Sequence, residues 1–380
     1  MEKYLGPILT ATVVFPLLAL LFTVPYIIYC YRKYGSVLAT RTVLMYAFIY
    51  YLMCIYALAI LPFPQEGTVV TQRTRVNLIP FNYVPEVIAK SGAFDWSDPR
   101  TWLPAIYSSG LYEPLCNILM FLPLGVFLRY YFGCKLWKTM LIAFLGSLFL
   151  ELTQLSATYG LAPYVYRCCD VNDLIDNTLG GMLGYAITPL LTWFLPSRER
   201  LNQVSYQRGS RVSYVRRTVA FLVDVFVDFA LQIILTFLNP FDGSLKYLIA
   251  GLTSAILYQG VFMILRKGQT LGKALVKIRL VDETTHAPAT PRAYMLRALI
   301  LWGVLLQASG WVNVLFKDFP TLFLAGVSVI ALLVQPGLLL CAVYNGIHNR
   351  PQMFYERQLH LIQISTLEKK QECAGTEGKK

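Results

Sequence analysis

Acidic and amide side chains recur inside apolar segments of this chain. The stretch "LELTQLS" places Glu151 and Gln154 three residues apart, and "RCCDVNDLIDNTLGGMLGY" (Arg167–Tyr185) carries Asp170 and Asp173 at its start. A carboxyl group at the centre of a membrane helix costs roughly 2.5–3.5 kcal/mol on insertion scales. Such residues are therefore expected to face protein and to form a polar site or an ion pathway.

The second stretch has one polar and glycine-rich face if it is helical. At roughly 100° per residue, an arc of about 80° collects Asp170, Asp173, Asn177, Gly181 and Gly184. Gly180 lies beside this arc, so Gly180 and Gly184 are spaced as a small-residue strip against which another helix packs closely. The polar end of this face is thus predicted to turn toward neighbouring helices.

Other segments supply partners for these groups. The full predicted outward site consists of Arg75, Asn77, Asn117, Glu151, Gln154, Arg167, Asp170, Asp173 and Asn177. Because a buried acid normally pairs, Arg75 and Arg167 are the candidate partners of Glu151. A structural alternative is that Asp170 or Asp173 only caps a helix N-terminus.

A second polar stripe lies in "RRTVAFLVDVFVDF". Arg217, Asp224 and Asp228 fall within about 40° of one another on a helix, and the two acids lie roughly 10 and 16 Å from Arg217 along its axis. One interpretation is that the acids pair with a basic residue from another span, such as Lys246 or Arg297. The other is an ion or proton pathway.

The elements that position these residues are membrane helices. The chain is 56% hydrophobic and 14% charged, against roughly 25% charged in a soluble domain. The sequence predicts an all-α polytopic membrane protein with nine spans, at 5–31, 42–63, 112–132, 139–158, 173–195, 218–238, 247–265, 296–316 and 321–345.

Basic residues predict the orientation of these spans. Most of the 33 lysines and arginines fall on one side if the N-terminus lies outside and the C-terminus inside the cell. The net charge of +12 is explained in this way, and no nucleic-acid partner is expected. The eight cysteines are expected to pack in the membrane rather than form a disulfide framework.

Composition divides the chain into four parts. Residues 1–195 form a first membrane domain, 196–217 a basic cytoplasmic linker, 218–362 a second membrane domain and 363–380 a polar tail. In the second domain "ALVKIRLVD" alternates like a short cytoplasmic strand. The preceding "GQTLGK" is no phosphate loop, because its glycines are too close and Ala274 replaces the required Ser or Thr.

Four motifs in the first domain resemble those of VanZ-like membrane proteins. They are "NLIPF" (Asn77–Phe81), "NILMFLPLG" (Asn117–Gly125), "ELTQL" (Glu151–Leu155) and Arg167–Tyr185, in matching order. The resemblance implies a bacterial, mainly Gram-positive, cell-envelope protein associated with lowered susceptibility to teicoplanin-type lipoglycopeptides. It carries the function onto the outward site.

The second domain resembles the RDD family over roughly residues 210–360. The resemblance rests on the Arg217, Asp224 and Asp228 stripe and on "KGQTLGKALVKIRLVD" (Lys267–Asp282). Glu356 stands where the family pattern implies Asp. Some members are proposed sodium–proton antiporters, which would make the stripe part of a transport path.

Three functions remain open from the residues. The hypothesis we favour is an outward site that binds a lipid-linked wall precursor or a lipophilic antibiotic, and transport is the alternative. A carboxylate-based enzyme acting on a lipid-linked substrate is the third. The three histidines, His286, His348 and His360, lie on the predicted cytoplasmic side, which excludes an outward Ser-His-Asp triad. No metal or cofactor is expected, and the oligomeric state is not predicted.

Overall fold

The computed structural model describes residues 2–61, 63, 76–85, 97–101, 109–162, 164–165, 167–316, 318–348 and 350–367. The chain forms two compact units. The N-terminal unit contains Met1–Thr23 and Ala39–Leu201, and the C-terminal unit contains Val24–Leu38 and Asn202–Lys380. The end of the first helix, α1 (Glu2–Tyr34), therefore belongs to the C-terminal unit, although most of the N-terminal unit lies between it and Asn202 in the sequence.

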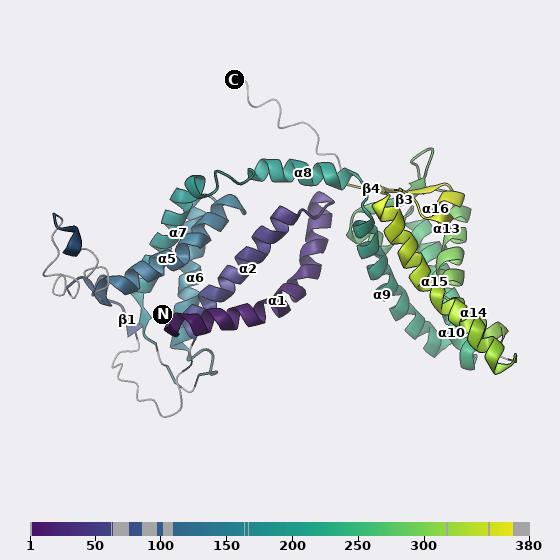
Figure 1. The fold of residues 1–380 in the computed structure, drawn as a ribbon, viewed down its shortest axis with the longest axis horizontal. Helices are drawn as coiled ribbons and strands as arrows, with labels where there is room; N and C mark the ends of the chain where they lie inside the picture. Colours follow the sequence, from purple (N-terminus) through teal and green to yellow (C-terminus); the bar gives the residue numbers. More distant parts are fainter. Residues whose placement is uncertain are drawn as a thin grey trace, which may run out of the picture. The chain divides into compact units, whose positions relative to one another are not determined.

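The N-terminal unit is a helix bundle (Figure 1). Its helices are α1, α2 (Ala39–Ile60), α5 (Ser109–Tyr130), α6 (Leu136–Leu155) and α7 (Val171–Leu191), with a short η1 (Pro99–Thr101). α7 packs on both α5 and α6, and α2 packs on α6. Its core includes Ile55, Ile60, Phe121, Leu124 and Leu150. Two residues each of β1 (Val76–Asn77) and β2 (Cys169–Asp170) pair in parallel beside the start of α7.

α5 and α7 approach closely at the predicted glycine strip. A Cβ added to Gly180 would meet the carbonyl oxygen of Ile118, and one added to Gly184 would meet that of Leu122. Only a residue without a side chain allows backbones to come so near. This close packing holds the polar N-terminal turns of α7 against α5.

The C-terminal unit combines helices with a two-stranded sheet (Figure 1). Its elements are α8 (Arg198–Ser210, from residue 202 on), α9 (Tyr214–Leu238), α10 (Gly243–Ser254), the π-helical η2 (Ala255–Phe262), α11 (Met263–Leu265), α12 (Leu271–Leu275), β3 (Ile278–Asp282), α13 (Pro291–Ala298), the π-helical η3 (Leu299–Leu305), α14 (Ala308–Leu315), α15 (Thr321–Ile347), α16 (Phe354–Gln358) and β4 (Leu361–Ser365).

The sheet confirms the strand predicted in "ALVKIRLVD". β3 pairs antiparallel with β4, and the register runs from Ile278 opposite Ser365 to Asp282 opposite Leu361. The inward-facing Ile278 and Leu280 are fully buried. Alternation of apolar and polar residues is the pattern of a strand with one covered face, which is why the sequence identified it.

The number of spans differs from the sequence prediction of nine. Among the described residues, seven helices are long and apolar enough to cross a membrane, and the count is eight if the bent pair Pro291–Leu305 and Ala308–Leu315, with a 65° angle, forms one span. The predicted span 173–195 corresponds to α7, which is long enough but falls short in hydropathy because its first two turns carry two Asp and two Asn residues.

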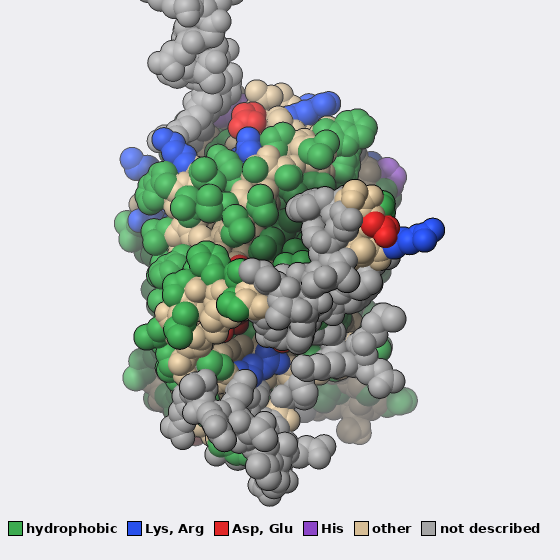
Figure 2. All heavy atoms as spheres, turned by 90° about the vertical axis from the view of Figure 1, so that its left-hand side faces the viewer, with side chains coloured by type: hydrophobic (Ala, Val, Ile, Leu, Met, Phe, Trp, Pro, Cys, Tyr) green, Lys and Arg blue, Asp and Glu red, His purple; other side chains and the backbone are tan. Residues whose placement is uncertain are grey.

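The outer faces of the long helices are apolar. Phe237 on α9 is 84% exposed and Leu322 on α15 is 88% exposed. Figure 2 shows hydrophobic side chains over much of the described surface on one side of the molecule. Helices that turn such surface outward are stable in lipid, where all backbone groups are satisfied within the helix. The chain is therefore an all-α polytopic membrane protein.

Candidate functional site

An acid–amide cluster forms where α7 begins in the N-terminal unit. We use this name for Asn77, Asn117, Glu151, Asp170, Asn172 and Asp173. The β1–β2 pair sets Asn77 directly opposite Asp170, and the Asn77 side-chain N–H donates to Asp170 Oδ2 over 2.9 Å. Asp170 is also the N-cap of α7, because its Oδ1 accepts the backbone N–H of Asn172 over 2.8 Å. The expected cap and the expected polar cluster thus involve the same residue.

Glu151 brings α6 into this cluster. Its Oε2 accepts the backbone N–H of Asp170 over 2.9 Å, and its carboxyl group adjoins that of Asp173, close enough for a hydrogen bond when one of the two is protonated. Glu151 is only 2% exposed. A hydrogen bond between two carboxyl groups needs one proton between them, since an ionised carboxylate has no donor. The pair is therefore arranged to hold and exchange a proton.

α5 joins through Asn117. Its side-chain N–H donates to Asp173 Oδ1 over 2.6 Å. Asn177, one turn deeper on α7, donates to Ser147 Oγ over 2.8 Å, and this hydroxyl in turn donates to the backbone oxygen of Asp173 over 3.2 Å. Three helices are thereby connected by hydrogen bonds around Asp173.

Gln154 and Arg167 lie beside the cluster and bind the end of α2. The Gln154 side chain donates to the carbonyl of Ala59 over 2.9 Å. The Arg167 guanidinium donates to the carbonyls of Leu58 and Leu61 over 3.4 and 3.2 Å. The expected ion pair of Arg167 with Glu151 is therefore replaced by contacts with free carbonyls of a helix C-terminus. The other expected partner, Arg75, lies outside the described residues.

Asn172 belongs to the cluster although the sequence analysis did not select it. It is 4% exposed, its Oδ1 accepts the backbone N–H of Phe81 over 2.6 Å, and its side-chain N–H donates to Asn82 Oδ1 over 2.9 Å. It thus fixes the segment that follows β1, where Phe81 has a positive φ of 56°. Its signal in the sequence was its place between two aspartates in the opening turn of α7.

Asp176 was also missed, and it lines a cavity. Its side chain is 4% exposed, and its Oδ2 has no hydrogen-bond partner among the described residues. The cavity has a volume of about 590 Å³, and it is otherwise mostly apolar. Its walls come from α5, α6, α7 and the segment after β1, and include Phe81, Tyr83, Leu115, Phe144 and Leu179.

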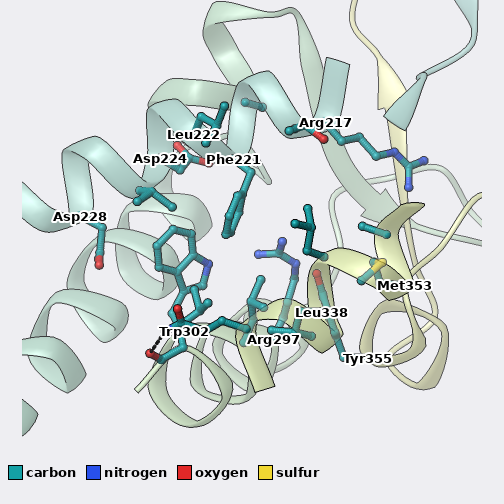
Figure 3. A pocket seen from close by; sticks show the side chains of 18 of the residues that line it. Arg217, Phe221, Leu222, Asp224, Asp228, Arg297, Trp302, Leu338, Met353 and Tyr355 are labelled. Carbon is teal, nitrogen blue, oxygen red and sulfur yellow. Dashed lines mark hydrogen bonds between the residues drawn. The ribbon is translucent and has the colours of Figure 1, made fainter. Parts of the chain in front are cut away.

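In the C-terminal unit, the sequence-predicted stripe lines one cavity, shown in Figure 3. Asp224 is 1% exposed and accepts hydrogen bonds from the Tyr258 hydroxyl at 2.7 Å, the Thr270 hydroxyl at 2.6 Å and the Gly272 backbone N–H at 2.9 Å. Lys273 completes this shell, with its Nζ 3.4 Å from Asp224 Oδ2. The "GQTLGK" segment therefore surrounds a carboxylate of its own chain.

The basic partner of the stripe is not one of the two residues given as examples. Asp224 pairs with Lys273 rather than with Lys246 or Arg297. Asp228 accepts from the Ser254 hydroxyl and the Gln232 side chain, each at 2.5 Å. Burial lowers the pKa of Lys273, and the neighbouring Asp224 opposes this change. The local loop is the closer partner because α12 packs directly on α9.

Arg217 and Arg297 converge on Glu356 instead. Arg217 NH1 lies 4.0 Å from Glu356 Oε2, and Arg297 Nε lies 3.8 Å from Glu356 Oε1. Glu356 is fully buried. Its carboxylate connects α9, α13 and α16.

Arg216, next to the predicted Arg217, is the more deeply buried arginine. It is 0% exposed and donates to the carbonyls of Val276, Lys277 and Gly209 over 2.7 to 2.9 Å. It fastens the start of α9 to the β3 segment. The stripe spacing indicates Arg217, and nothing in the sequence distinguishes Arg216 beside it.

Comparisons with known proteins agree with the two sets of motifs. The family model VanZ/LLP1 matches residues 48–192, and that of the RDD family matches residues 211–344. No curated protein and no solved structure matches the chain. The matches cover the two sets of motifs in the expected order, and with the membrane-spanning helices they identify the chain as a VanZ-like domain followed by an RDD-family domain, in one multi-pass protein of the bacterial cell membrane.

Proposed function

We propose that the VanZ-like domain binds an amphiphile of the cell envelope from the outer side of the membrane, and that this binding lowers susceptibility to teicoplanin-type lipoglycopeptides. The ligand is either the antibiotic itself or a lipid-linked wall precursor. The observation that carries the proposal is a buried carboxylate oxygen of Asp176 in the wall of an apolar cavity, which no hydrogen-bond donor of the described residues reaches. The similarity to VanZ/LLP1 proteins supports an envelope role.

The polar groups determine which part of such a ligand they recognise. Carboxylates accept hydrogen bonds from hydroxyl, amide N–H and ammonium groups, and side-chain amides both donate and accept. The sugar and peptide parts of a wall precursor or a lipoglycopeptide offer these donors.

The cavity beside these groups suits an acyl chain. Ligand sites are typically mostly apolar with a few polar groups that fix the orientation, and their volumes fall in the range of this one. Leu115 and Ile118 of α5 and Leu174 and Leu179 of α7 are among its apolar lining residues. An amphiphile therefore satisfies Asp176 with its polar end and covers this wall with its tail.

The test is antibiotic susceptibility of a sensitive Gram-positive host that expresses the chain. Glu151→Gln and Asp176→Asn keep side-chain size and remove a carboxylate, and Asp228→Asn is the matched change in the RDD domain. We expect wild type and Asp228→Asn to protect against teicoplanin, and the first two variants to lose protection at equal membrane levels. A glycopeptide without an acyl chain should be affected less. Full protection by Glu151→Gln would contradict the proposal.

A second candidate is acid–base catalysis on a lipid-linked substrate, and the hydrogen-bonded pair Glu151 and Asp173 favours it. Such a pair can donate a proton to a leaving group and accept one from a nucleophile. This function predicts a chemically altered lipid that accumulates over many turnovers. Mass spectrometry of extracted lipids from cells with wild type and Glu151→Gln distinguishes it from binding, which leaves the lipid unchanged.

A further inference from the structure

The RDD domain contains a cavity of about 590 Å³ that is distinct from the site proposed above (Figure 3). We call it the arginine cavity, after Arg217 and Arg297 in its wall. It lies among α9, η3, α15 and α16, and its apolar lining includes Phe221, Leu338 and Leu339. α9 and α15 are both membrane-spanning helices. The apolar lining of a cavity between such helices is chemically suited to the acyl chain of a lipid.

Buried donors that have no hydrogen-bond partner among the described residues line this cavity. Arg297 is 4% exposed, and its Nε and NH1 have no hydrogen-bond partner among the described residues. Arg217 Nε and NH1 and the indole Nε1 of Trp302 are in the same condition. Figure 3 shows the Arg297 guanidinium in the middle of the cavity and Arg217 at its edge. Every one of these atoms is a donor, so together they need an acceptor.

Glu356 does not supply enough acceptors for both arginines. Its separations from Arg217 and Arg297, 4.0 and 3.8 Å, exceed hydrogen-bond distance. Its oxygens already accept from the Met353 backbone N–H at 3.2 Å and the Gln363 side chain at 2.8 Å. Glu356 also carries a single negative charge against the two positive charges of these guanidinium groups.

The other acids of the cavity are engaged elsewhere. Asp224 is surrounded by Tyr258, Thr270, Gly272 and Lys273. Asp228 accepts from Ser254 and Gln232. Unpaired buried guanidinium N–H groups are costly, so an anion that accepts from them stabilises the folded domain.

We propose that the arginine cavity binds the phosphate group of an anionic membrane lipid. Arg297 and Arg217 donate to the phosphate oxygens, a geometry to which the planar guanidinium fork is well suited. The Trp302 N–H adds a third donor, and the acyl chain lies along Phe221, Leu338 and Leu339. The apolar wall, which free phosphate would leave uncovered, favours the lipid over the inorganic ion.

The experiment measures lipid binding to the purified full-length chain in detergent by native mass spectrometry. The probes are dioctanoyl phosphatidylglycerol, dioctanoyl phosphatidylcholine and inorganic phosphate. We expect phosphatidylglycerol to bind at least about 10-fold more tightly than phosphatidylcholine, because both lipids carry the phosphate but only phosphatidylcholine adds an ammonium group, which the two arginines repel. Arg297→Gln and Arg217→Gln should each weaken it about 10-fold. Arg292→Gln, an exposed arginine on the same helix as Arg297, is the matched control and should bind like wild type.

Equal binding of the two lipids would overturn the proposal, as would wild-type phosphatidylglycerol affinity in Arg297→Gln. Inorganic phosphate that binds as tightly as phosphatidylglycerol would show that the ligand is not a lipid. If Arg297→Gln does not fold, Arg217→Gln at the cavity edge decides in its place. The outcome is independent of the VanZ-like site, because none of these residues belongs to it.

Discussion

Replacing Asp224 by Asn is the sharpest test of how the RDD domain is held together. The carboxylate accepts from Tyr258 and Gly272 through Oδ1 and from Thr270 and Lys273 through Oδ2. Asn keeps the acceptor at the first position. At the second it places an N–H₂ group against a lysine that is 5% exposed. The stabilisation that Asp224→Asn removes is therefore mainly that of the ion pair with Lys273.

The magnitude follows from burial of the charge that is left behind. Removing one partner of a buried ion pair costs about 3–5 kcal/mol, because the remaining charge is neither solvated nor paired. Lys273 has no other anion at contact distance among the described residues, and its second contact is the Thr270 hydroxyl at 3.4 Å. We expect Asp224→Asn to lower the free energy of unfolding of the domain by an amount in this range.

A double-mutant cycle separates this cost from general damage. Lys273→Met removes the ammonium group and keeps an unbranched side chain. With both charges gone, Asp224→Asn/Lys273→Met should be more stable than Asp224→Asn alone, with a coupling of roughly 0.5–3 kcal/mol. Asp242→Asn is the control, since this exposed residue caps α10 without a side-chain hydrogen bond and should change stability by less than about 0.5 kcal/mol.

The assay is unfolding by titration with SDS, followed by tryptophan fluorescence. Of the six tryptophans, Trp302 and Trp311 lie in the RDD domain, so a background with the other four changed to Phe reports on this domain alone. Wild-type stability of Asp224→Asn would refute the reasoning. So would a double variant whose loss equals the sum of the two single losses, because additivity means that the two charges do not interact.

Two further predictions follow from the structure. The stability deficit of Asp224→Asn relative to wild type should narrow as pH rises from about 7 to about 9.5, because burial lowers the pKa of Lys273 and loss of the carboxylate lowers it further. The folded lysine of the variant then binds fewer protons than the unfolded one, whose pKa is about 10.4, so the stability of the variant rises with pH in that window. A constant deficit in the same SDS titration at several pH values would contradict this prediction. Gly184→Ala should destabilise the VanZ-like domain by about 1–3 kcal/mol, because its Cβ would meet the carbonyl oxygen of Leu122. Thermal unfolding in detergent measures this loss. The control Gly146→Ala, whose Cβ would lie 3.7 Å from Phe121, should show no such loss.

The sequence predicts the helices and strands better than it predicts which distant residues form hydrogen bonds with one another. The arc of about 80° that the sequence predicts as the polar face of α7 leaves Asp176 outside it. α7 packs on both α5 and α6, and its buried arc is correspondingly wider. Charge alone suggested arginine partners for Glu151, yet its described partners are the backbone N–H of Asp170 and the carboxyl of Asp173.

The sequence by itself determined where the chain resides and which residue types had to be sheltered. Apolar runs of about 20 residues leave water for lipid, and carboxyl groups within or beside them must face protein because hydrocarbon does not solvate charge. Alternation likewise determined that 278–282 is a strand. These properties depend on local composition and period, which a single segment contains in full.

Only the tertiary structure decided which partner each polar group meets. Asn77 reaches Asp170 across 93 positions, Glu356 lies between arginines of α9 and α13, and β4 is the strand that completes β3. A hydrogen bond requires its atoms to meet within a few tenths of an ångström. That depends on how closely helices pack, as at Gly180 and Gly184, and on loop paths between them, and these are set by the whole fold rather than by any segment.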